Sequence, residues 1–165
     1  VYQCNIYTLD LLRLLLGNDY IGSRYSLKDG TPTVAGLDDI DFMKKKGIWD
    51  SFTMNNPSFD SNILDKWMNE VGSQRYGWKK VETLKDFGVG VLLMGVTKSE
   101  RVKAKNPEIG HAFVIMPLSE SEIALSQATN NIRFEILDHT HKKANPIDPK
   151  GEYNFWYQSP NVTRK

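Results

Sequence analysis

The segment Gly110-His111-Ala112-Phe113-Val114-Ile115-Met116 carries the clearest signal for a buried β-strand in this chain. A histidine follows the glycine, and apolar residues then continue without a break through Met116. A short apolar run that is rich in β-branched and aromatic residues is typical of a strand covered on both faces. The segment therefore predicts a strand over residues 112–116, with His111 at its beginning.

Three further segments in the second half of the chain have the pattern of strands. They cover residues 89–96, 132–137 and 154–157, and the second of them alternates Ile132, Phe134 and Ile136, which predicts that these three side chains face the core together. Clusters of glycine and polar residues at 98–110 and 119–131 separate the strands and are interpreted as loops. We expect about four strands in a mostly antiparallel sheet over residues 82–165.

The first half of the chain has the period of helices. Leu9, Leu12 and Leu16 recur at three-residue and four-residue spacing, and Leu11 and Leu14 widen the apolar surface, which predicts a buried central helix that begins at about Cys4. Shorter helices are expected over residues 38–46 and 61–71. The predicted fold class is therefore α+β. We expect one domain over residues 1–165, with N-terminal helices (1–81) packed on the sheet.

Composition excludes several classes of protein. The net charge is only +1 and the Lys and Arg residues are dispersed along the sequence, so the sequence predicts no basic patch for binding nucleic acid. A single cysteine cannot form an intramolecular disulfide, and no apolar stretch approaches the roughly 18 to 20 residues of a membrane span. Because the chain begins at Val1, we expect it to be a piece of a longer polypeptide that is secreted or delivered into a target cell.

The residues with catalytic potential are a thiol, an imidazole and a carboxyl group. Cys4 stands at the start of a helix, where the helix dipole favours a thiolate. His111 supplies a general base, and Asp138, directly after a predicted strand, is expected to orient the imidazole. The backbone N–H of Cys4 is the first candidate for an oxyanion donor, and the adjacent Gln3 is the second. Such a Cys-His-Asp triad requires no cofactor.

This arrangement resembles the papain-like cysteine hydrolases in their compact bacterial forms, which include NlpC-type peptidoglycan amidases and the catalytic domains of effectors and toxins. The resemblance lies in a Cys heading a helix, a Gly-His opening a strand and an acidic residue ending the next predicted strand. It implies a papain-like fold and hydrolysis of an amide bond, by proteolysis, peptidoglycan cleavage or glutamine deamidation. It also implies a protein or peptidoglycan substrate, with a cognate immunity or inhibitor protein as a further partner. Other candidates for the third member of the triad are Asn130, Asn131 and His139.

Two alternative functions remain open at this level. A zinc-dependent hydrolase would use His139 and His141, which share one face if they lie on a strand, together with His111, leaving a coordination position for water. The other alternative is a non-catalytic interaction domain.

Overall fold

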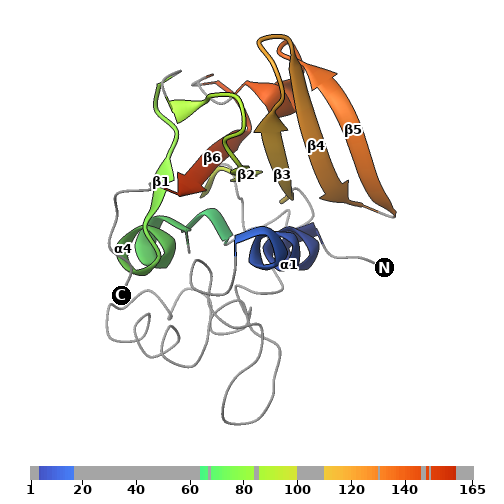
Figure 1. Ribbon diagram of the computed structural model, residues 1–165. Coiled ribbons are helices and arrows are strands. Elements are labelled where there is room, and N and C mark those ends of the chain that lie inside the picture. Colours follow the sequence, from blue (N-terminus) through green and yellow to red (C-terminus); the bar gives the residue numbers. More distant parts are fainter. Residues whose placement is uncertain are drawn as a thin grey trace.

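The framework of the molecule is an antiparallel β-sheet (Figure 1). The computed structural model describes residues 4–16, 64–66, 68–83, 86–99, 110–129, 131–145, 148 and 150–158. Within these ranges the sheet has six strands in the order β1-β6-β2-β3-β4-β5, and every neighbouring pair is antiparallel. The strands are β1 (Trp78–Lys80), β2 (Leu93–Thr97), β3 (Ala112–Pro117), β4 (Glu122–Ala128), β5 (Ile132–Asp138) and β6 (Tyr153–Gln158).

The helical content of the described residues is small, and the predicted fold class is wrong on this point. The helix expected at the start of the chain is present as α1 (Cys4–Leu16). Residues 64–66 are also helical, and the further helical elements of the described ranges are short: the π-helical η3 (Met68–Gly72), α4 (Ser73–Arg75) and the 3-10 turn η7 (Lys142–Ala144). The helix expected over 38–46 lies outside the described residues. The described residues thus form a six-stranded sheet with one substantial helix, not several helices on about four strands.

The two strands that were not predicted explain the difference in the sheet. β4 falls in a segment interpreted as a loop, because serines precede it and Thr129 and Asn131 follow it. β1 has three residues, too few to show any period, and it lies in the half of the chain expected to be helical. The strands predicted over 112–116, 132–137 and 154–157 are confirmed, and the one predicted over 89–96 begins only at Leu93.

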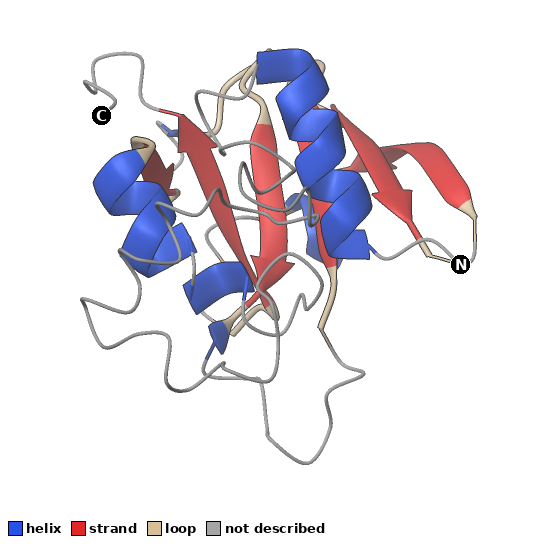
Figure 2. Ribbon diagram, turned by 90° about the horizontal axis from the view of Figure 1, so that it is seen from below, coloured by secondary structure: helices blue, strands red, loops and turns tan. Residues whose placement is uncertain are grey.

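The sheet buries apolar side chains on both faces. Helix α1 packs against β3 and β4 on one face, where Leu9 and Leu12 meet Val114, and Figure 2 shows the helix lying across the strands. Phe113 and Phe155 belong to a second cluster on the opposite face. Gly95 is required there, because a Cβ atom at this position would lie 2.3 Å from the ring of Phe113.

The outer face of β5 differs from the prediction. Ile132, Phe134 and Ile136 are exposed by 50%, 70% and 48%, so they do not face the core. Alternation identifies residues that share a face of a strand, but it does not show whether another element covers that face. β5 is the last strand of the sheet, and this position leaves its apolar side open.

None of the described helices is both long and apolar enough to cross a membrane.

Candidate active site

His111 is held at the beginning of β3 by backbone contacts with β2. Its N–H donates to Oγ1 of Thr97 at 2.8 Å, and its carbonyl oxygen accepts from the N–H of Thr97 at 3.0 Å. The imidazole stacks on the ring of Phe113, with 5.8 Å between the centroids. The histidine therefore has a defined position at one end of the sheet, which we call the site end.

The imidazole of His111 is paired with Gln127 on the neighbouring strand β4. The distance from His111 Nε2 to Gln127 Oε1 is 2.7 Å, and the glutamine side chain is buried, with 4% of the residue exposed. Lys143 Nζ donates to the same Oε1 atom at 2.8 Å. An ammonium group can only donate, so the shared glutamine atom is the carbonyl oxygen and His111 Nε2 carries a proton. This hydrogen-bond network makes Nδ1 the nitrogen that can accept a proton when the imidazole is neutral.

Lys143, which belongs to η7, is the third member of this hydrogen-bond network. Its Nζ atom lies 5.7 Å from the centroid of the Phe113 ring. Burial, and next the charge of Lys142, lower the pKa of Lys143 from its ordinary value. The lysine thus fixes the orientation of the Gln127 amide, which in turn fixes the imidazole.

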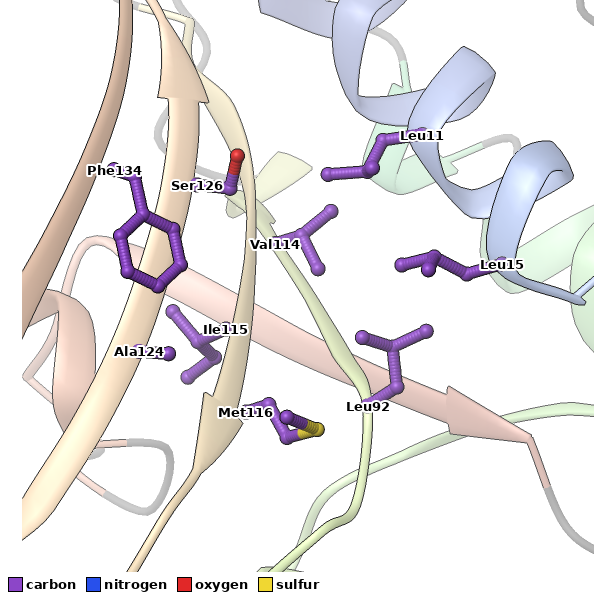
Figure 3. A pocket seen from close by; sticks show the side chains of 9 residues that line it. All are labelled: Leu11, Leu15, Leu92, Val114, Ile115, Met116, Ala124, Ser126 and Phe134. Atoms are coloured by element: carbon purple, nitrogen blue, oxygen red, sulfur yellow. The ribbon is translucent and has the colours of Figure 1, made fainter.

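Cys4 is the first residue of α1, and the direction of this helix carries it toward the site end. Tyr7 Oη and Ser126 Oγ are 2.6 Å apart, which ties α1 to β4 at Ser126, whose side chain lies on the face of the sheet opposite to that of Gln127. Cys4 and Tyr7 share a face of the helix, and Cys4 lies about 4.5 Å further along its axis. The later residue Leu11 lines a groove at the other end of β3 (Figure 3). Figure 1 accordingly shows the N-terminal end of α1 below the ends where β3 begins and β4 stops.

Tyr153 is a second titratable residue near the site end. This tyrosine is paired with Thr97 in the sheet, and its ring meets Phe113 edge-on at 4.9 Å. Burial is the largest of the effects that raise the pKa of Tyr153 to about 12. The charge of Glu152, a hydrogen bond with Glu152 and the charge of Cys4 follow in that order. The hydroxyl group of Tyr153 therefore stays protonated to higher pH than that of a free tyrosine.

The raised pKa of Tyr153 predicts a loss of stability in alkali. An unfolded tyrosine titrates near pH 10, so between about pH 10 and 12 the unfolded chain releases a proton that the folded chain retains. The free energy of unfolding should therefore fall as the pH rises through this window, by about 2 to 3 kcal/mol at pH 12. Urea unfolding at pH 9 to 12 should show a smaller decline in Tyr153→Phe than in the wild type. Equal declines in the two proteins would contradict the assignment.

Asp138, the predicted third member of the triad, lies elsewhere. In the sheet it pairs with Glu122 at the start of β4, whereas Gln127 lies five residues further on, about 17 Å along the strand. Asp138 Oδ1 accepts from the N–H of Thr140 at 2.8 Å and also from its hydroxyl group. These two bonds, led by the hydroxyl, lower the pKa of Asp138. The structure thus places Gln127, and not Asp138, against His111.

Gln127 was missed because its strand was interpreted as a loop. The signal was present as Ile123, Leu125 and Gln127 at alternate positions, since a polar side chain that continues a buried apolar face is a candidate partner for a buried group. Among the other candidates, His139 and Asn131 are exposed. Gln3 and Asn130 lie outside the described residues.

The three histidines of the zinc alternative are not brought together. His111 is bound to Gln127, whereas His141 Nδ1 accepts from the N–H of Lys143 at 3.1 Å. In the part of the chain that the structure describes, no group of three or more His, Cys, Asp or Glu side chains is placed to hold a metal ion. The geometry therefore offers no support for the metalloenzyme hypothesis.

Comparison of the chain with protein-family models, curated proteins and solved structures finds no match. Support for a site accordingly comes from the contacts of its own residues.

Proposed function

We propose that this protein is a cysteine hydrolase that cleaves an amide bond, with Cys4 as nucleophile, His111 as general base and Gln127 as the residue that orients the imidazole. The observation that carries the proposal is the partly buried hydrogen bond from His111 Nε2 to Gln127 Oε1, which Lys143 holds in one orientation. A nucleophile, a base and a group that orients the base are the components that such a reaction needs.

The proposed reaction begins with transfer of the Cys4 thiol proton to Nδ1 of His111. The thiolate attacks the amide carbonyl carbon, and the N-terminal end of α1 favours the negative charge that develops there. Collapse of the tetrahedral intermediate breaks the C–N bond, and the imidazolium gives its proton to the leaving amine. Water then attacks the thioester, His111 accepts a proton from it, and release of the acid restores the thiol.

Gln127 has a positioning role throughout this cycle. His111 Nε2 keeps its proton in both the neutral and the cationic imidazole, so Oε1 of Gln127 can accept a hydrogen bond from it at every step. A glutamine orients the ring without adding a negative charge.

Proteolysis, peptidoglycan cleavage and glutamine deamidation share this chemistry, and analysis of the products distinguishes them. The protein should be incubated separately with peptidoglycan fragments and with a protein extract, and the products analysed by mass spectrometry. New peptide or glycan-linked termini would indicate cleavage. A mass gain of about 1 Da, at a glutamine, would indicate deamidation by the same acyl-thioenzyme route. No product that depends on Cys4 in either mixture would contradict the proposal.

Gln127 offers a separate test of the mechanism. Gln127→Ala should lower kcat roughly 10-fold to 100-fold with little change in KM, since correctly placed acid–base catalysis contributes about 10²-fold to 10⁴-fold. Gln127→Glu should retain more activity, because a carboxylate still accepts from Nε2. Kinetics across pH 5 to 9 would measure both effects. Thr129→Ala is the matched control, because Thr129 is exposed just beyond the same strand. An unchanged kcat in a folded Gln127→Ala variant would rule out the positioning role.

A further inference from the structure

One of the two edges of the sheet is formed by β5, which has β4 on one side and no strand of the described residues on the other. We propose that this edge pairs with β5 of a second copy of the chain. The two strands would run antiparallel around a twofold axis at Phe134, and would join the two sheets into one. An open strand edge presents backbone N–H and C=O groups that favour such pairing.

The apolar side of β5 supplies the first argument. Phe134 is 70% exposed, and it lines an apolar groove of about 220 Å³ together with Leu11 and Leu15 of α1 (Figure 3). Ile132 and Ile136 flank Phe134 on the same face of the strand and are about half exposed. Three large apolar side chains in a row on an edge strand form a surface that is typical of an interaction site.

The sequence of the strand identifies the partner as a second copy. Residues 132–136 read Ile-Arg-Phe-Glu-Ile, an order in which apolar residues are symmetric about Phe134 and opposite charges stand on either side of it. Antiparallel pairing centred on Phe134 sets the two phenylalanines opposite each other and each Ile132 opposite Ile136 of the other copy. Arg133 then lies opposite Glu135 of the other copy, twice by symmetry. Cross-strand pairs of both kinds stabilise antiparallel sheets.

The two charges have no ionic counterpart across β4. The residue opposite Arg133 in the register of the sheet is Gln127, and the residue opposite Glu135 is Leu125. Neither of these carries a charge, so the charge pattern of β5 has no ionic counterpart on β4, although Lys143 of η7 lies within electrostatic range of both side chains. Moving the axis to Arg133 or Glu135 would place two like charges directly opposite each other, which destabilises the pairing. Charge therefore selects the register centred on Phe134.

The twofold axis of such a pair is perpendicular to the sheet, so α1 lies on the same side in both copies. The two Phe134 rings meet between the two grooves. One pair of strands buries less surface than a standard protein interface, and we expect dissociation on the order of micromolar.

Charge exchange tests this interface. Sedimentation equilibrium should compare the wild type with Arg133→Glu, Glu135→Arg and the double variant that carries both changes. Either single change sets like charges opposite each other at two places, and should weaken dimerisation roughly tenfold or more. The double variant restores opposite charges and should dimerise as the wild type does. An equimolar mixture of the two single variants should form the mixed dimer, because the two acidic side chains of the Arg133→Glu chain then face the two arginines of the Glu135→Arg chain.

The restored dimers separate this interface from a general loss of stability, which thermal unfolding of each variant would measure independently. A wild type that stays monomeric into the high micromolar range would overturn the proposal. Binding of β5 to an added strand-forming peptide or to a lipid vesicle by such a monomeric protein would not rescue it. Single variants that dimerise like the wild type, or a double variant that fails to recover, would overturn it as well.

Discussion

Replacement of Cys4 by alanine or serine should abolish amide hydrolysis, with kcat lowered at least about 10³-fold, as removal of a nucleophile does in comparable triads. His111→Ala should cause a loss of similar size, because the two groups act as one unit and their effects are not additive. The measurement is turnover of whichever substrate the product analysis identifies. The wild type and the variants should be compared at equal concentrations of folded protein.

The reactivity of the thiol tests the same assignment without a substrate. The chain has one cysteine, so alkylation by iodoacetamide reports on Cys4 alone. A thiolate favoured by the helix dipole and by His111 should react rapidly near pH 6, and His111→Ala should slow this reaction. His139→Ala is the matched control, since this histidine is exposed in a turn after β5. Alkylation as slow as that of an ordinary thiol, or equal rates in the wild type and His111→Ala, would contradict the catalytic pairing.

Removal of the Asp65 carboxyl group should destabilise the fold by about 3 to 5 kcal/mol, because buried donors are left without an acceptor. Asp65 is 3% exposed, and one oxygen accepts from Trp156 Nε1 at 2.9 Å. The other accepts from the N–H and the hydroxyl group of Ser99 at 2.9 and 2.6 Å. The Asn154 amide also donates to the carboxyl group, at 3.1 and 3.2 Å. Asp65 thus connects the helical residues 64–66 to the end of β2 and to β6.

Urea unfolding of Asp65→Ala would measure this loss. Asp148→Ala is a suitable control, because Asp148 is exposed and accepts from the N–H of Lys150 at the surface, so its loss should cost less than about 1 kcal/mol. The effect should extend to the site, since Ser99 lies two residues after Thr97, which holds the backbone of His111. Two variants of equal stability would show that this buried network contributes little to folding.

Local pattern was sufficient for the two elements that carry the proposed nucleophile and base. The leucines after Cys4 recur with the period of a helix, and α1 begins at that residue. The apolar run after His111 predicted β3 to within one residue. Both signals are strong because a long periodic helix and a continuous apolar strand are recognisable without their neighbours.

The third residue of the proposed triad shows where local pattern fails. Asp138 was preferred because it follows alternating Ile132, Phe134 and Ile136, but these side chains lie on the open face of an edge strand. Gln127 was not considered, because β4 has few large apolar residues and polar clusters flank it. A strand acquires its burial and its neighbours from the order of the sheet, and that order depends on contacts between residues distant in the sequence.

The helix that follows Cys4 and the strand that follows His111 could both be predicted, since each depends on a pattern within one short segment. Three other features became visible in three dimensions: Gln127 meets the imidazole, Asp138 lies at the other end of β4, and β5 is an edge strand. These are consequences of strand pairing. Two strands become neighbours because backbone hydrogen bonds and burial are optimised over the whole sheet, and no single segment contains that information.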